Sequence, residues 1–213
     1  MDSCVTAAIA RTKCNSMAFL HANYGQRTQD RELQAFNKLA EFYGVTEKLV
    51  INLTYLNHIG GSCLTDPTIA VPEANLDNLE IPISYVPFRN ANILSAAVSW
   101  TEVINADAIY VGAVEEDSSG YPDCRRSFYD AFEKTIIEGT KPETKISIET
   151  PLINLEKSEI IKKGIALKAP IELTWSCYEN NDFPCGKCDS CVLRARGFER
   201  AGCSDKIINL ERN

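Results

Sequence analysis

Short apolar segments alternate with helical segments along this chain, and this alternation restricts its fold more than any other feature. Four segments have the character of buried strands, at residues 17–22, 48–53, 108–113 and 145–149. Helical spacing of apolar residues marks six others, at residues 1–13, 27–43, 90–105, 126–138, 155–167 and 189–200. Strands that are apolar along their length and alternate with helices are typical of a parallel sheet covered on both faces. We therefore expect a doubly wound α/β fold with a parallel sheet.

Nothing in the sequence divides the chain, so we expect a single domain over residues 1–213. A chain of this length can bury a sizeable core. The longest stretch without a regular pattern is residues 57–88, which contains several prolines. A loop this long inside a compact domain is more often functional than idle.

The composition argues against two classes of partner. The formal net charge is −7 and the sequence pI is about 5.0, whereas non-specific nucleic-acid binders and membrane-surface binders are usually basic. No apolar run approaches the roughly 20 residues that span a bilayer, and no signal peptide is visible. We therefore expect a cytoplasmic protein with no direct nucleic-acid contact and no membrane association.

Four cysteines near the C-terminus have the spacing of a metal site. Seven residues separate the first two, and two residues separate each later pair, at Cys177, Cys185, Cys188 and Cys191. Thiolates at this spacing can wrap a tetrahedral zinc ion from a tight turn, and four protein ligands leave no position for substrate. The spacing therefore predicts a structural zinc site within residues 170–203, whose negative charge the nearby Lys187, Arg194 and Arg196 can offset. The alternatives are two disulfides or four unrelated thiols.

The other five cysteines show no pairing pattern: Cys4, Cys14, Cys63, Cys124 and Cys203. Unpaired cysteines suit a reducing compartment, and there closely spaced cysteines favour metal over disulfides.

The first four residues, Met1-Asp2-Ser3-Cys4, match the end of a Ser-Gly-Gly-x-Asp-Ser phosphate loop of the kind found in ATP pyrophosphatases. In such a loop, glycines let backbone N–H groups face phosphate at a helix N-terminus. Taken alone, the same residues favour an ordinary helix cap over a phosphate loop.

Further polar segments follow or flank the predicted strands, at residues 23–27, 86–90, 112–117, 119–125 and 149–152. In this order, and together with the four-cysteine segment, they closely resemble the 7-cyano-7-deazaguanine synthase family. The resemblance extends from Met1 to about Cys203, and the combination is specific although no single segment is.

The resemblance implies a Rossmann-like domain of the adenine nucleotide alpha hydrolase type, with a C-terminal zinc-binding helical segment. It implies an ATP-dependent ligase that converts 7-carboxy-7-deazaguanine and ammonia to 7-cyano-7-deazaguanine in queuosine biosynthesis. The carboxylate would be adenylated, converted to an amide, and activated again to give the nitrile. ATP, Mg²⁺ and zinc would be bound, and the protein would be a homodimer.

The resemblance also assigns roles to single residues. The catalytic candidates are Arg89, as an anion clamp, and Asp117. The candidates for nucleotide binding are Asp2, Ser3, Tyr24, Gly25, Arg89 and Gly112. The candidates for substrate binding are Glu115, Tyr121, Asp123 and Arg125.

Several of these residues also have a purely structural interpretation. Arg89 and Arg125 can be surface ion-pair partners, and residues 115–117 can be a solvated loop. Gly25 can be no more than a turn before a helix.

The chain departs from the family pattern at its start, because the Ser-Gly-Gly and the strand before it are absent. In the strand order 3-2-1-4-5 that strand is the central one. We therefore expect unpaired edges on the strands at 17–22 and 108–113, and poor activity of the chain as written. Two other functions stay open: another ATP pyrophosphatase, either tRNA-modifying or amidating, and a non-catalytic zinc-stabilised nucleotide-binding relative.

Overall fold

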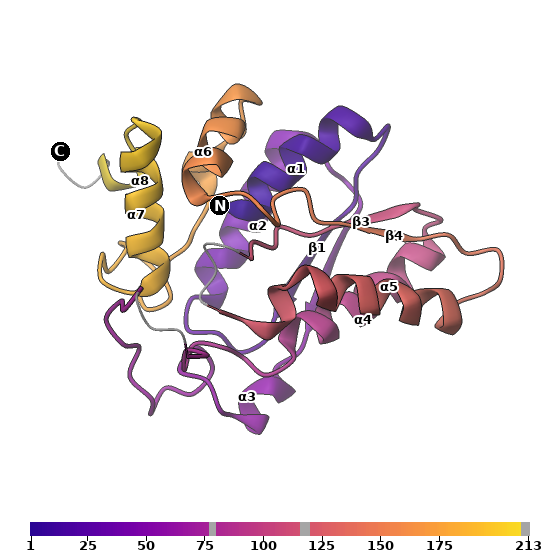
Figure 1. Cartoon of the computed structure of the whole chain (residues 1–213), viewed down its shortest axis with the longest axis horizontal. Helices are drawn as coiled ribbons and strands as arrows, with labels where there is room; N and C mark the ends of the chain where they lie inside the picture. The colour runs from indigo at the N-terminus through magenta and orange to yellow at the C-terminus, as the bar shows by residue number, and fades with distance from the viewer. Residues whose placement is uncertain (77–79, 116–119, 210–213) are drawn as a thin grey trace.

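A computed structural model of the chain describes residues 1–76, 80–115 and 120–209, and its elements alternate as expected (Figure 1). The strands are β1 (Phe19–Asn23), β2 (Lys48–Asn52), β3 (Ala108–Tyr110) and β4 (Ser147–Glu149). The longer helices are α1 (Asp2–Lys13), α2 (Gln29–Tyr43), α4 (Arg89–Val103), α5 (Arg126–Gly139), α6 (Lys157–Ala166) and α7 (Asp189–Ala201). Every predicted helix and strand is therefore confirmed.

The sequence patterns missed four short elements. These are α3 (Tyr55–Ile59), α8 (Lys206–Asn209) and the 3-10 turns η1 (Pro122–Cys124) and η2 (Ile171–Leu173). Each is about one turn long, too short to show a helical period. Two predicted strands are also shorter than expected, since β3 and β4 have three residues each.

The strands are parallel, as predicted, but they form two separate pairs. β1 pairs with β2 in the register Phe19 opposite Lys48, and β3 pairs with β4 in the register Ala108 opposite Ser147. In the described part of the chain, β1 and β3 each carry a hydrogen-bonded neighbour on one side only. The expectation of unpaired edges on these two strands is thus confirmed.

Helices pack against the β3–β4 pair from opposite sides, and Figure 1 shows this pair between α1 and the α4–α5 helices. One core joins α1, α6 and α7 through Val5, Ile161 and Phe198. A second core joins α4 and α5 to the strand pair through Leu94, Tyr129 and Ile148 among others. None of the described helices is long and apolar enough to cross a bilayer.

The N-terminal end of α1 lies directly against the segment that follows β3. A Cβ atom on Gly112 would be 2.6 Å from the backbone nitrogen of Ser3 and 2.9 Å from the carbonyl carbon of Asp2. Real Cβ atoms do not approach backbone atoms so closely, so glycine at position 112 lets the helix end meet the strand end.

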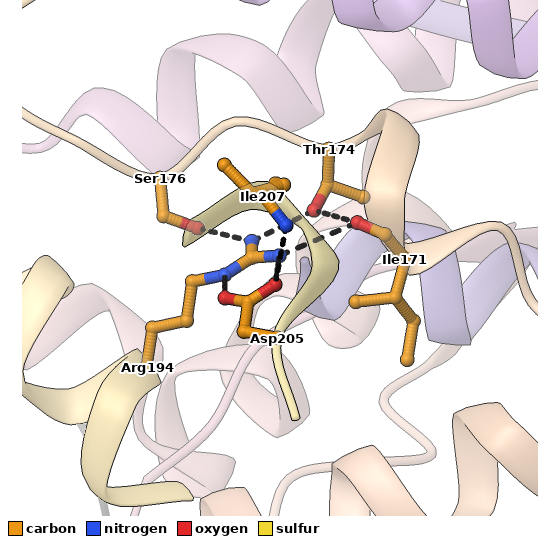
Figure 2. Close-up of polar contacts among 6 residues, drawn as sticks. All are labelled: Ile171, Thr174, Ser176, Arg194, Asp205 and Ile207. Atoms are coloured by element: carbon orange, nitrogen blue, oxygen red, sulfur yellow. Dashed lines mark hydrogen bonds and ion pairs between the residues drawn. The ribbon is translucent and has the colours of Figure 1, made fainter. Parts of the chain in front are cut away.

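A buried arginine ties α7 to the segments on either side of it (Figure 2). Arg194 donates through Nε and Nη2 to the two carboxylate oxygens of Asp205, at 2.5 and 3.1 Å. Nη1 donates to the hydroxyls of Thr174 and Ser176 at 2.8 and 3.2 Å, and Nη2 also donates to the carbonyl of Ile171. All five N–H groups of the guanidinium are therefore used.

These contacts change the expected role of the basic residues near the cysteines. Arg194 is paired with Asp205, and the side chains of both are buried. Lys187 lies 3.9 Å from Glu179 on the surface. Neither contact supports the expectation that Arg194 and Lys187 offset thiolate charge.

We expect Gly112→Ala to lower the free energy of unfolding by about 1–3 kcal/mol, because the added methyl group forces α1 away from β3. Thermal or urea unfolding measures this. Gly139→Ala is the matched control, since nothing lies within 4 Å of a Cβ there. In a helix, alanine at that position should be neutral or slightly stabilising. Equal stability of the two variants would contradict the close approach.

We expect Arg194→Met to lower the free energy of unfolding by about 3–5 kcal/mol, because it leaves the Asp205 carboxylate buried and unpaired. Arg200→Met is the control on the same helix. Arg200 is exposed and lies 4.0 Å from Glu156, so its loss should change stability by less than about 1 kcal/mol. If Arg194→Met is as stable as this control, the buried pair does not fix the segment.

Candidate active site

Two adjoining cavities, of about 200 and 160 Å³, lie where the predicted functional segments converge. They share one wall, which is formed by Met1, Asp2, Ser176, Tyr178 and Ser190. This wall brings the N-terminal end of α1 together with the cysteine-containing segment.

Each cavity then has a wall of its own. The first, which we call the β1 cavity, is closed by Tyr24 and residues 26–28 after β1. The second, the β3 cavity, is closed by Arg89, residues 112–114 after β3, and Tyr121. Asp2, Tyr24, Arg89, Gly112 and Tyr121, which the sequence places far apart, therefore line one continuous region.

The loop after β1 is held rigidly by the first turn of α2. The Tyr24 N–H donates to Gln26 Oε1 at 2.9 Å, and Gln26 Nε2 and Thr28 Oγ1 donate to the Glu32 carboxylate at 3.2 and 2.7 Å. These bonds connect the wall of the β1 cavity to α2.

Gly25 has a structural role in this loop. Its φ is 79°, and a Cβ there would lie 2.9 Å from the Asn57 side-chain nitrogen. It is not among the described residues that line the two cavities. These observations favour the turn interpretation of Gly25.

Asp2 forms an ion pair with Lys157, which sequence reasoning missed. Lys157 Nζ lies 3.0 and 3.1 Å from the two Asp2 oxygens, and Lys157 also lines the β3 cavity. Burial raises the pKa of Asp2, but Lys157, the N-terminal amine and Arg194 together more than offset this, so that the pKa of Asp2 lies below its ordinary value. Lys157 is the first residue of α6, which follows β4 closely in the chain. Because ligands bind beyond the carboxyl ends of parallel strands, this position could have identified Lys157 as a candidate site residue.

Arg89 lies at the start of α4 and faces Tyr24. Its Nη1 donates to the Tyr24 hydroxyl at 3.1 Å, and its guanidinium carbon lies 5.1 Å from the centre of the Tyr24 ring. Burial lowers the pKa of Arg89, but Tyr24, Tyr121, Asp123 and Cys124 raise it above its ordinary value, so the side chain stays charged. Within the described ranges no carboxylate forms an ion pair with Arg89, which removes the surface ion-pair interpretation for those ranges.

The structure places Ser3, Glu115 and Arg125 outside the described cavity walls. Ser3 is exposed, although its backbone touches Gly112. Glu115 accepts the Arg126 N–H at 2.9 Å and so caps α5. Arg125 is exposed at the start of the same helix.

Asp123 is buried behind the β3 cavity rather than on its described wall. Its Oδ2 accepts the backbone N–H of Asn90 at 2.9 Å. Burial raises the pKa of Asp123 above its ordinary value. The catalytic candidate Asp117 lies outside the described residues.

The four predicted zinc ligands form a compact group. Their sulfur atoms all lie within 4.8 Å of one another, and none forms a disulfide. A tetrahedron of thiolates about 2.3 Å from zinc has similar sulfur–sulfur distances, so the geometry fits this ion. Backbone N–H groups of Glu179, Asn180 and Cys185 point at the Cys177 sulfur at 3.3–3.4 Å. Such donors stabilise a thiolate ligand.

Comparisons with known proteins identify the family of this chain. The model of the family described as "Queuosine biosynthesis protein QueC" matches residues 1–202. A 7-cyano-7-deazaguanine synthase of Chlorobium phaeobacteroides is 59% identical over 97% of this chain and 92% of its own length. Those of Chloroherpeton thalassium and Chlorobaculum tepidum are 56% and 53% identical over 97% of this chain, and over 92% and 91% of their own lengths. The chain therefore belongs to the QueC family of queuosine biosynthesis proteins.

Proposed function

We propose that this chain is a 7-cyano-7-deazaguanine synthase, which converts 7-carboxy-7-deazaguanine and ammonia to the nitrile at the expense of ATP. The similar proteins carry this name, and the family description names queuosine biosynthesis. The match over nearly the whole chain favours this reaction over the tRNA-modifying, amidating and non-catalytic alternatives.

The observation that carries the proposal is a charged arginine at the wall of a cavity, with no acidic ion-pair partner among the described residues. Arg89 uses Nη1 on Tyr24 and has no carboxylate partner in the described ranges. A cation held in this way binds an anion favourably, and the planar guanidinium suits a carboxylate or a phosphate. Both groups occur on the reactants of this synthase.

The two cavities suit two reactants that must meet. We assign ATP to the β1 cavity beside Tyr24 and the end of α1, where the helix dipole favours phosphate. We assign 7-carboxy-7-deazaguanine to the β3 cavity beside Tyr121 and Arg89. The carboxylate and the α-phosphate would then meet at the shared wall near Asp2. Lys157, at 3.0 Å from Asp2, supplies a second cation there.

We expect such a site to accelerate the reaction mainly by holding the substrate carboxylate close to the α-phosphate of ATP. A carboxylate is a poor electrophile until it is adenylated, and adenylation requires it to lie in line with the α-phosphate. Cations that face the phosphates stabilise the charge of the transition state. Mg²⁺ would accompany ATP, and we propose Asp117 among its ligands and Glu115 and Arg125 as outer contacts of the substrate.

We propose zinc as the ion bound by the four cysteines, in a structural role. The same segment contributes Ser176, Tyr178 and Ser190 to the shared wall of the cavities. Zinc would therefore hold the wall in place without taking part in the reaction.

We further propose that the protein is a cytoplasmic homodimer. All nine cysteines are free thiols in the structure, which suits a reducing compartment. The dimer follows from the family resemblance alone, and light scattering during size-exclusion chromatography tests it.

We expect Arg89→Ala to lower kcat/KM for nitrile formation by roughly 100-fold, as loss of one charge-stabilising contact does in other enzymes. Steady-state kinetics with 7-carboxy-7-deazaguanine, ammonia and ATP measure this. Arg11→Ala is the matched control, because Arg11 is exposed at the far end of α1. A folded Arg89→Ala variant with unchanged kinetics would remove Arg89 from the site. A wild-type chain that forms no nitrile would overturn the proposed reaction.

We expect one zinc ion per chain, and its loss in Cys188→Ala should loosen residues 170–203. Elemental analysis gives the zinc content, and limited proteolysis gives the loosening. Cys14→Ala is the control, because Cys14 follows α1 outside the cluster. Zinc-free wild-type protein prepared without chelator would disprove the site, as would disulfides between these cysteines.

A further inference from the structure

The first turn of α4, which presents Arg89, lacks a capping side chain of its own. The residue before it, Phe88, has φ 56° and makes no side-chain capping bond. Phenylalanine rarely adopts this left-handed conformation, so the surrounding structure must enforce it. Asp123, from η1, supplies the missing acceptor, since its Oδ2 lies 2.9 Å from the Asn90 backbone nitrogen.

The side chain of Asn90 is fixed by the same turn. Its Nδ2 donates to the backbone carbonyl of Asp123 at 3.0 Å and faces the Cys124 sulfur at 3.4 Å. The opposite amide orientation would place two oxygen atoms against each other. Asn90 Oδ1 must therefore point away from η1, and it points at Arg89.

The guanidinium of Arg89 is held from two directions as a result. Asn90 Oδ1 lies 3.4 Å from Nε and 3.3 Å from Nη2, while the Tyr24 hydroxyl lies 3.1 Å from Nη1. Of the five N–H groups, two have no partner in the described part of the chain, one on each terminal nitrogen. Because Arg89 lines the β3 cavity, these two groups are the ones left for an anion.

Asp123 itself is poorly placed to bind a ligand. It is 3% exposed, and its Oδ1 makes no hydrogen bond within the described residues. Burying a carboxylate with an unsatisfied oxygen lowers the stability of the fold, so we expect such a residue to have a role that compensates for this cost. Its visible use is to hold Asn90, which in turn orients Arg89.

We propose that Asp123 and Asn90 are positioning residues. They aim the two N–H groups of Arg89 that have no partner among the described residues at an anionic group of a reactant. The anion is the carboxylate of 7-carboxy-7-deazaguanine or a phosphate of ATP. This inference rests on the proposed function. In place of direct substrate binding by Asp123, it proposes that Asp123 orients Asn90, which in turn orients Arg89.

The test is a double-mutant cycle between Asn90→Ala and Arg89→Ala. We expect Asn90→Ala to lower kcat/KM by about 10-fold or more, since small misplacements of a positioning group have such effects. Asn90→Ala should lower kcat/KM no further in the Arg89→Ala background, because the guanidinium that Asn90 orients is then absent. Additive losses would overturn the proposal. The affected KM identifies the anion, because a rise for only one of the two reactants assigns the contact to that reactant.

The second arm uses Asp123. Asp123→Asn keeps an oxygen that can accept the Asn90 N–H, so we expect activity within about 3-fold of wild type, whereas Asp123→Ala should resemble Asn90→Ala. If Asp123→Asn is as damaging as Asp123→Ala, the charge itself acts on the substrate and the positioning role is wrong. Asn92→Ala is the control, because Asn92 makes two side-chain hydrogen bonds in the same turn, to Tyr55 and Phe88.

The proposal and the proposed function fail in different ways. The same double-mutant cycle is also measured on ATP affinity, by calorimetry. If the wild-type chain forms no nitrile, the proposed reaction is wrong, and the ATP affinities still test the positioning role. If Arg89→Ala changes neither turnover nor ATP affinity, there is no anion contact to position, and the inference falls.

Discussion

The arrangement of this protein depends on one close contact, between the N-terminal end of α1 and Gly112 at the end of β3. Only a glycine allows the Ser3 backbone to come so near the strand end. Because α1 also shares a core with α6 and α7, the contact fixes three helices relative to the β3–β4 pair. It also places Asp2 where the two cavities meet. A shift of this helix end would change both cavities at once.

The cysteine segment completes the shared wall of the two cavities. It contributes Ser176, Tyr178 and Ser190 to the shared wall, and it is secured twice. The four sulfurs gather its turn, and Arg194 joins α7 to Ser176 and to Asp205. A buried ion pair adds little net stability compared with well-packed apolar residues in its place. We therefore interpret the Arg194–Asp205 pair as a contact that fixes the position of α7. These two groups of contacts therefore hold the wall that the two cavities share.

Arg89 shows how the fold presents a buried cation at the wall of a cavity. Burial disfavours its charge, and among the described residues its guanidinium donates only to neutral partners, Tyr24 and Asn90. Two N–H groups stay available in the described structure, whereas the guanidinium of Arg194 is fully used. The two arginines line the same cavity but have different roles, and their partners rather than their residue type decide this. Tyr24 and Asn90 are neutral, so these two hydrogen-bond partners do not cancel the positive charge that Arg89 presents to the cavity.

The sequence by itself determined the helices and strands, the parallel pairing and the group of four cysteines. These features depend on residues close together in the chain, through the helical period, unbroken apolar strands and ligand spacing. It also singled out Arg89 and Gly112 as candidate site residues, and both line the β3 cavity. Only the tertiary structure decided which distant residues meet. Lys157 reaches Asp2 across 155 positions, and Asp123 caps a helix that begins 34 residues earlier, while Arg125 beside it faces solvent. No local pattern encodes such contacts, because they arise from how whole helices pack against the strand ends.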